Sequence, residues 1–259
     1  MKKILLLCIC IACIYYISAS FVPAKGNNTS PHPSSSSAWT ILPQSKENWP
    51  KPLYITWQVQ HLKESAQQKI GQQNWIPLKN MPKTLVQAIV AVEDRRFYEH
   101  SGIDIDGIVR ATLVNIQADE VVQGASTITQ QLIKNNILNS EQTMGRKISE
   151  AALALYIEGQ YNKDDILEMY LNTTYFGAGA TGVKAAAATY FGMEPFQLSL
   201  AESATLAALP NAPSALNPYE NLDGCTKRRN LVLSLMGKYG YLRQDEVTTA
   251  QQTPLKLAK

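Results

Sequence analysis

Residues 83–100, with the sequence KTLVQAIVAVEDRRFYEH, carry the pattern that decides the fold. Leu85, Ile89 and Val92 recur at helical spacing, which predicts a helix that continues up to Phe97. Helical patterns follow one another through most of the chain after this segment, and strand patterns are few. The sequence therefore predicts a single, mainly α-helical domain.

More helices are expected along the rest of the chain. Asp104 can cap a helix that carries Ile108 and Leu113, and Ser126 can cap another that contains Ile128. The remaining helices are expected over residues 146–160, 163–172, 181–190, 198–209 and 226–237.

Two segments depart from this helical pattern. Residues 54–59 favour a short strand. Gly177, Gly179 and Gly182 separate two expected helices, so the backbone there is expected to turn sharply or to approach a ligand closely.

The bulk composition is that of a folded protein with a weak positive charge. The chain has 259 residues, of which 45% are hydrophobic and 17% charged, so it can bury a sizeable core. A net charge of +3 suits an anionic membrane surface or a phosphate-bearing ligand. It falls well short of a nucleic-acid-binding signature, so no nucleic-acid partner is expected.

The N-terminus predicts export. Lys2 and Lys3 precede an apolar run over residues 4–22, which is about the length of a single membrane-spanning helix. The lysines would stay in the cytoplasm, so residues 1–22 are interpreted as an anchor. The alternative is a signal peptide cleaved after the small residues 18–20.

The chain divides into four parts. The anchor is followed by a flexible linker rich in Ser and Pro over residues 23–48, a folded domain over 49–250 and a tail over 251–259. Cys225 is the one cysteine outside the apolar N-terminal run, so no disulfide is expected within the domain.

Glu93 is the first candidate for chemistry, because it directly follows the apolar run 88–92. Burial raises the pKa of a carboxylate, and this suits a general acid or base. The alternative is a solvated helix end at which Glu and Arg side chains pair at the surface. This segment alone favours the alternative, because charge runs are common and catalytic ones are rare.

Residues 124–135, GASTITQQLIKN, form a second candidate. Hydroxyls and amides stand at a helix start, and Lys134 follows two turns later, an arrangement that can bind an anion. An ordinary serine cap followed by a polar helix face explains the segment equally well.

Arg146, Lys147 and Glu150 form a third candidate. Three- and four-residue spacing places them on one face of a helix, which by itself usually means a surface ion pair.

Taken in order, these three segments resemble the first three motifs of glycosyltransferase family 51. This is the peptidoglycan glycosyltransferase domain of class A penicillin-binding proteins and of monofunctional transglycosylases. The resemblance continues through residues 166–172, 176–183, 190–192 and 200–218. Several motifs in one order are far more specific than any one of them.

The resemblance implies a lysozyme-like, bilobed helical domain whose smaller lobe faces the membrane. Family members polymerise lipid II into β-1,4-linked glycan strands, with inversion and release of undecaprenyl pyrophosphate. The implied partners are lipid II, the growing glycan strand, the membrane and other cell-wall synthesis proteins. The implied location is the bacterial cytoplasmic (inner) membrane, with a single span and the catalytic domain on its outer, periplasmic face. Because no transpeptidase motif is found, the monofunctional type is expected.

The resemblance also assigns the two carboxylates of the site. Glu93 is expected to be the general base. Glu150 is the second catalytic carboxylate, near the leaving pyrophosphate, where it either positions the substrate or binds a divalent cation, Mg²⁺ or Mn²⁺. No organic cofactor is implied.

The other expected site residues fall into two groups. Those implied to bind the donor substrate are Arg110, Ser126, Thr127, Gln130, Gln131, Lys134 and Arg146. Those implied to hold the first motif in shape are Asp94, Phe97, His100 and Gly102. Ile133, Ile137 and Leu138 are expected either to dip into the bilayer or to pack in the core.

Two departures from the family pattern concern the donor site. Gln142 and Met193 stand where many relatives carry a basic residue.

Two other functions stay open at this point: a lysozyme-like glycan hydrolase, and a non-catalytic scaffold that binds wall precursors. Arg110 and Lys134 argue against the hydrolase, because a hydrolase needs no pyrophosphate site.

Overall fold

The structure is a computed structural model that describes residues 49–118, 124–138 and 144–258. The predicted anchor (1–22) and linker (23–48) lie outside this range. No helix within it combines the length and apolar character needed to cross a bilayer.

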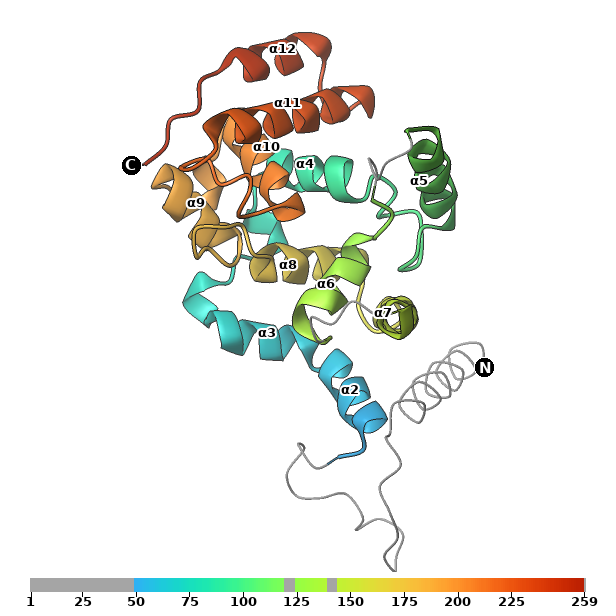
Figure 1. Ribbon diagram of the computed structural model, residues 1–259. Coiled ribbons are helices and arrows are strands. Elements are labelled where there is room, and N and C mark those ends of the chain that lie inside the picture. The colour runs from blue at the N-terminus through green and yellow to red at the C-terminus, as the bar shows by residue number, and fades with distance from the viewer. Residues whose placement is uncertain (1–48, 119–123, 139–143, 259) are drawn as a thin grey trace, which may run out of the picture.

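The described part of the chain is helical, with one isolated bridge between Tyr175 and Thr181 and no strand. This confirms the expected mainly α fold. Short 3₁₀ turns occur at Gln72–Asn74, Leu78–Asn80, Pro195–Gln197 and Leu209–Asn211. The α-helices are α2 (Lys51–Gln60), α3 (Leu62–Ile70), α4 (Lys83–Glu93), α5 (Ile105–Ala118), α6 (Ile128–Asn136), α7 (Met144–Ile157), α8 (Lys163–Thr173), α9 (Val183–Phe191), α10 (Leu200–Ala208), α11 (Leu222–Lys238) and α12 (Gln244–Gln252) (Figure 1).

Helix α4 forms the centre of the domain. It begins after Pro82 and buries Leu85, Ala88 and Ile89 against α10 and α11. It ends at Glu93, four residues earlier than expected, because the backbone of Asp94 leaves the helical conformation (φ −159°, ψ 77°). The buried helix therefore delivers Glu93 to its C-terminal end.

The remaining helices pack around this centre in two groups. Helix α12 packs on α11, while α6 packs against both α7 and α8, and α8 also contacts α3 (Figure 1). Helix α5 stands apart from the body of the molecule in the same view.

The strand expected over residues 54–59 is wrong, because these residues belong to α2. Val59 is buried and Ile55 packs against the same core, and their four-residue spacing is that of one helix face. The sequence reading also missed α3 and α12, each of which buries only two residues.

The glycine-rich turn between α8 and α9 is confirmed. Gly177, Gly179 and Gly182 have φ values of 89°, 77° and 83°, a region that only glycine adopts readily. A Cβ atom on Gly177 would lie 2.5 Å from the carbonyl oxygen of Pro213, so the backbone approaches closely there as well.

The apolar residues after the second motif pack in the core. Ile133 is fully buried, and Ile137 and Leu138 pack against the same core, so the bilayer contact expected for Ile133 is wrong. Five of the twelve large hydrophobic residues that are exposed in the described part of the chain lie instead on α5.

Candidate active site

Glu93 occupies the C-terminal end of α4, where it is half-buried and faces α6. Its Oε2 accepts a hydrogen bond from Nε2 of Gln131 at 2.8 Å. Burial raises the pKa of Glu93, while the Gln131 bond and the charges of Arg228 and Lys134 act in the opposite direction. The expected desolvated carboxylate is therefore present, and its role as a base stays a prediction.

Asp94 ties the first motif to the second. Its carboxylate accepts the backbone N–H of Ile128 at 3.1 Å, and Nε2 of His100 lies 3.0 and 2.9 Å from its two oxygens. Phe97 is fully buried beside them, and the ammonium of Lys163 lies 4.5 Å from the centre of its ring. These contacts are what a shape-holding role requires.

The backbone conformation and the surroundings of residue 102 both require glycine. It has a φ of 88°, and a Cβ atom there would lie 2.5 Å from the carbonyl oxygen of Ala154. Its own carbonyl oxygen accepts a hydrogen bond from Oγ1 of Thr127 at 2.7 Å. The chain after the first motif is thereby held against the start of α6.

Helix α6 is capped by Thr127, and the cap expected at Ser126 is wrong. Thr127 and Gln130 form a reciprocal capping box, with hydrogen bonds of 3.1 and 2.9 Å between side chain and backbone. Both residues are buried, at 2% and 3% exposure. Their side chains serve the helix start, and a contact of either residue with a donor substrate stays a prediction.

Ser126 is instead joined to the third motif. Its Oγ accepts a hydrogen bond from Nζ of Lys147 at 3.0 Å, and the same ammonium lies 2.5 Å from Oε1 of Glu150. Glu150 is 1% exposed, so the surface ion pair that its spacing suggests is wrong. Its Oε2 is buried and has no hydrogen-bond partner among the described residues.

The other predicted cations are spread along the chain. Lys134 is exposed on α6, and its positive charge lowers the pKa of Glu93. Arg146 precedes Lys147 in the first turn of α7, and Gln142 lies outside the described residues.

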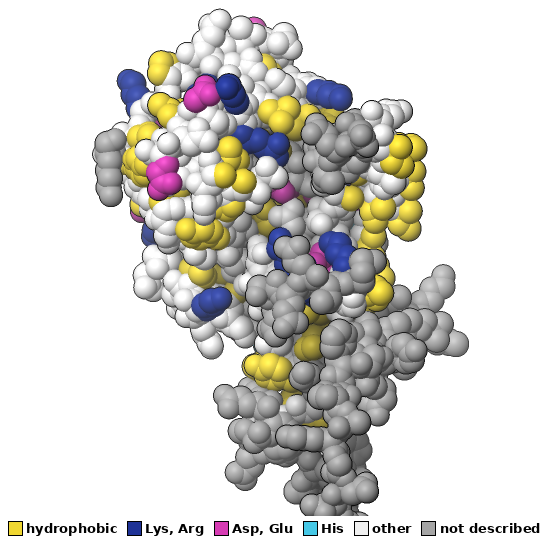
Figure 2. Space-filling model, in the orientation of Figure 1, with side chains coloured by type: hydrophobic (Ala, Val, Ile, Leu, Met, Phe, Trp, Pro, Cys, Tyr) yellow, Lys and Arg dark blue, Asp and Glu magenta, His cyan; other side chains and the backbone are white. Residues whose placement is uncertain are grey.

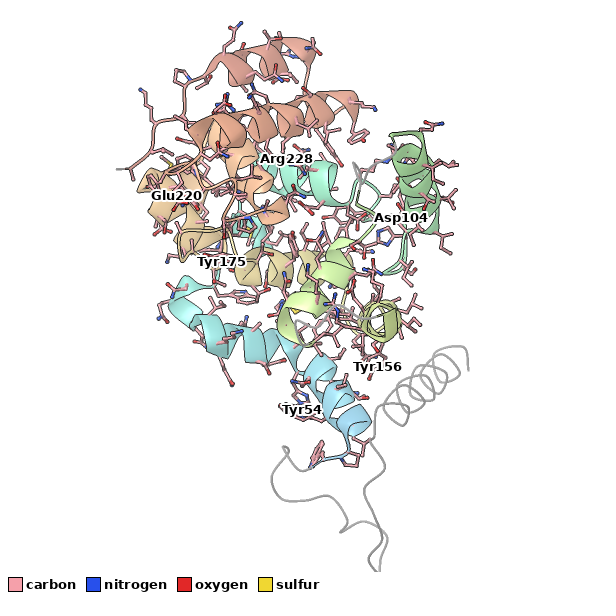
Figure 3. The ribbon with its side chains drawn as sticks, in the orientation of Figure 1. Tyr54, Asp104, Tyr156, Tyr175, Glu220 and Arg228 are labelled. Carbon is pink, nitrogen blue, oxygen red and sulfur yellow. The ribbon has the colours of Figure 1, made fainter. Side chains whose placement is uncertain are left out.

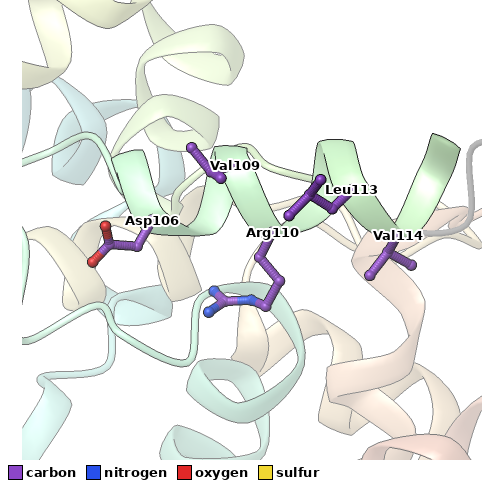
Figure 4. A pocket seen from close by; sticks show the side chains of 5 residues that line it. All are labelled: Asp106, Val109, Arg110, Leu113 and Val114. Atoms are coloured by element: carbon purple, nitrogen blue, oxygen red, sulfur yellow. The ribbon is translucent and has the colours of Figure 1, made fainter. Parts of the chain in front are cut away.

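Arg110 lies on α5, where it faces Asp104. One guanidinium nitrogen lies 3.8 Å from Oδ2 of Asp104. Asp106, Arg110 and Val114 project from the same side of α5 and line a pocket of about 420 Å³ together with Val109 and Leu113 (Figure 4). Within the described residues, the structure pairs Arg110 with Asp104, and no ion pair joins it to Glu93.

Arg228 is a candidate that the sequence reading missed. It lies on α11 in the part of the molecule next to α4 (Figure 3), and its positive charge lowers the pKa of Glu93. Its Nε is buried without a hydrogen-bond partner among the described residues. The sequence offers no signal for Arg228, because the arginine that shares the apolar face of α11 with Val232 and Met236 is its neighbour Arg229.

Basic and acidic side chains come together on one face of the molecule. In Figure 2, Lys and Arg side chains surround a hollow in the middle of the displayed face, and acidic side chains lie within it. The described residues contain no group of three or more His, Cys, Asp or Glu side chains that could hold a metal.

Comparison with known proteins shows which family and which proteins the chain is similar to. A family model described as Transglycosylase matches residues 60–237. Penicillin-binding protein 1A of Aquifex aeolicus is 48% identical over 185 residues, which are 71% of this chain and 26% of that protein. The same-named protein of Haemophilus influenzae is 46% identical over 189 residues, which are 72% of this chain and 22% of that protein.

The chain thus spans about a quarter of the length of the curated relatives that it matches. The crystal structure of penicillin-binding protein 1A from Haemophilus influenzae aligns with a TM-score of 0.43 and 26% identity, and covers 71% of this chain and 18% of that one. The family match covers well over half of the chain and includes the three segments that form the site. The chain belongs to the transglycosylase family.

Proposed function

We propose that this protein is a peptidoglycan glycosyltransferase that polymerises lipid II into β-1,4-linked glycan strands. The observation that carries the proposal is the desolvated carboxylate of Glu93, on which the cations Lys134 and Arg228 both act. A base whose pKa two nearby cations lower suits a reaction in which a hydroxyl attacks a sugar linked to pyrophosphate.

The proposed step uses Glu93 on the acceptor side. Glu93 takes the proton from the 4-hydroxyl of the incoming lipid II as that oxygen attacks C1 of the growing chain. The bond between C1 and the pyrophosphate oxygen breaks, and undecaprenyl pyrophosphate leaves. Attack opposite the leaving group inverts the anomeric carbon and yields the β-1,4 linkage.

The donor side needs positive charge more than it needs an acid, because pyrophosphate is already a good leaving group. Lys134 is exposed and Lys147 is anchored between Ser126 and Glu150, so both can meet phosphate oxygens. Ser126 and Gln131 are half-buried and remain the proposed polar contacts of the donor.

Glu150 is the proposed ligand of a divalent cation, Mg²⁺ or Mn²⁺. Its buried Oε2 has no hydrogen-bond partner in the described residues, which fits a cation that takes its other ligands from phosphate oxygens and water. Such an ion would supply positive charge to the leaving pyrophosphate. Lys147 already supplies positive charge at the other oxygen, so we propose that the ion assists the reaction and is not strictly required.

Helix α5 supports a site at the membrane surface. Ile105, Val109, Leu113 and Ile116 are 71%, 55%, 57% and 70% exposed, and hydrophobic side chains gather at that edge in Figure 2. Apolar exposure of this extent is typical of a membrane or protein contact. We propose that α5 belongs to the smaller, bilayer-facing lobe of a lysozyme-like fold.

The proposed location follows from the same surface. The domain would work on the outer, periplasmic face of the cytoplasmic membrane, where lipid II, the growing strand and other cell-wall synthesis proteins meet. Residues 1–22 would be the single-span anchor.

Incubation of the detergent-solubilised full chain with lipid II tests the function. The expected product is long glycan strands, and the Glu93→Gln variant should make none while still binding lipid II. Shortening of preformed strands would show a hydrolase instead. Lipid II binding without strand synthesis by the unaltered protein would show a scaffold.

A further inference from the structure

Tyr170 begins a chain of hydrogen bonds that ends at Glu93. Its side chain is fully buried on α8, and its hydroxyl donates to Oε1 of Gln131 at 3.1 Å. The amide nitrogen of Gln131 in turn donates to Oε2 of Glu93 at 2.8 Å. Three helices, α8, α6 and α4, are thereby joined through three side chains.

The direction of these bonds follows from the chemistry of the groups. An ionised carboxylate can only accept hydrogen bonds, so Glu93 must face the amide nitrogen of Gln131. The amide oxygen then points away from Glu93 and needs a donor, which the Tyr170 hydroxyl supplies. The reverse orientation of the amide would bring two acceptor oxygens together.

We propose that Tyr170 is a positioning residue for the reaction: its hydroxyl holds the Gln131 amide by the oxygen, so that the amide N–H stays directed at Glu93. The catalytic part of this inference rests on the function proposed above, while the hydrogen-bond chain itself does not. Tyr170 need not touch a substrate in this role.

The charged and titratable groups that act on Glu93 come from several elements. Lys134 lies on α6, Arg228 on α11, Tyr170 on α8 and Asp94 next to Glu93 in the chain. Solvent and salt screen the exposed Lys134, and a bound phosphate would neutralise it. The bond from Gln131 is different, because a buried side chain of the protein, Tyr170, holds the oxygen of this amide.

The Tyr170 hydroxyl is suited to remain a donor. Burial raises its pKa well above the ordinary value for a tyrosine, and the nearby Glu93 charge adds to this effect. It therefore stays protonated throughout the pH range in which the enzyme would work.

Loss of this hydroxyl should change the proton affinity of Glu93. Without a donor for its oxygen, the Gln131 amide is free to rotate toward another partner, and Glu93 loses a stabilising N–H. A hydrogen bond to a charged group is strong enough that the acidic limb of the pH–rate profile should move to higher pH by about one unit.

The test compares Tyr170→Phe with Tyr190→Phe in the full chain, using lipid II polymerisation rates measured against pH. Tyr190 is also fully buried, but its hydroxyl donates to the backbone oxygen of Phe176 at 2.9 Å. The control therefore loses a comparable buried bond that is not linked to Glu93. Tyr170→Phe should shift the acidic limb, and Tyr190→Phe should leave it at its original pH.

Two further measurements separate positioning from a general structural effect. In a Gln131→Leu background, Tyr170→Phe should add no further shift, because the connecting amide is gone. Replacing Tyr170 with 3-fluorotyrosine keeps the ring and makes the hydroxyl a stronger donor, so the limb should move toward lower pH. If Tyr170→Phe fails to fold, the 3-fluorotyrosine variant still tests the proposal, because an unchanged acidic limb would contradict it.

A direct titration keeps this inference distinct from the proposed function. The carboxyl resonance of Glu93 can be followed by ¹³C NMR and assigned as the signal missing from Glu93→Gln. If the unaltered protein makes no glycan, the proposed function fails, yet the NMR titration still tests Tyr170. The inference is overturned if folded Tyr170→Phe leaves the Glu93 titration unchanged, or if its full shift persists in the Gln131→Leu background.

Discussion

The carboxylate of Asp94 accepts the backbone N–H of Ile128 at 3.1 Å, and this bond fixes the end of α4 against the first turn of α6. The two residues belong to different sequence motifs. Their contact explains why a carboxylate beside the proposed base is itself buried, at 7% exposure. Asp94 thus holds these two helices in position and need not take part in the reaction.

Asp94→Ala should lower the free energy of unfolding by about 2–4 kcal/mol, because it strands the buried N–H of Ile128 and a ring nitrogen of His100. Chemical denaturation measures the change. Asp106→Ala is the control, since Asp106 is exposed and pairs with Arg96 at the surface, and its loss should change stability by less than about 1 kcal/mol. Equal losses in the two variants would contradict the assigned role.

Glu93→Gln should abolish polymerisation and also alter the dependence of stability on pH. Burial raises the pKa of Glu93 in the folded state, so between the unfolded and folded pKa values the folded chain holds a proton that the unfolded chain has released. Stability therefore falls as the pH rises through that window, and Glu93→Gln should remove this fall. Unfolding curves at several pH values test the sign.

The control for that measurement is Glu99→Gln. The Glu99 side chain is 65% exposed and pairs with Arg96, so this variant should keep both the activity and the pH dependence of the original protein. If Glu93→Gln shows the same pH-dependent fall as the unaltered chain, Glu93 is not the desolvated group.

Arg228→Met should move the acidic limb of the activity profile to higher pH, because it removes a positive charge that stabilises ionised Glu93. The shift should become smaller as salt is added, since charge–charge interactions are screened. The neighbouring Lys227 is exposed and pairs with Asp223, so Lys227→Met should leave the profile in place. A salt-independent shift would indicate a packing effect instead.

Lys134→Ala should weaken donor binding about tenfold or more, because a lysine that contacts phosphate makes a charge-assisted hydrogen bond. Binding of moenomycin, which mimics the donor lipid in this family, can measure the loss. Lys69→Ala removes an exposed lysine from the distant helix α3 and should have no effect. Equal weakening of donor and acceptor binding by Lys134→Ala would argue against a phosphate role.

Gly102→Ala should destabilise the domain by more than the simple backbone penalty of about 1–2 kcal/mol, because its Cβ would collide with the carbonyl oxygen of Ala154. Gly240→Ala isolates that penalty, since Gly240 also has a positive φ of 77° but open space around it. Thermal unfolding of both variants gives the difference. A difference near zero would mean that Ala154 moves aside easily.

Local sequence patterns predicted those parts of the fold that depend on one helix face. The spacing of Leu85, Ile89 and Val92 predicted α4, because such a face must be buried somewhere whatever its partner. The same reasoning failed for α12, which buries only Val247 and Ala250. A helix with so short an apolar face is stabilised mainly by its neighbours, here partly by Arg229, whose guanidinium holds the carbonyl oxygens of Gln251 and Thr253.

The sequence by itself determined that the chain is helical and which family it resembles, because both follow from residue spacing and motif order. Only the tertiary structure decided that Glu150 is buried, that Thr127 rather than Ser126 caps α6, and that Arg228 acts on Glu93. The physical reason is that desolvation and charge pairing depend on distances between residues far apart in the chain. Arg228 lies on α11 and Glu93 on α4, and packing of these two helices creates an electrostatic relationship that no local pattern records.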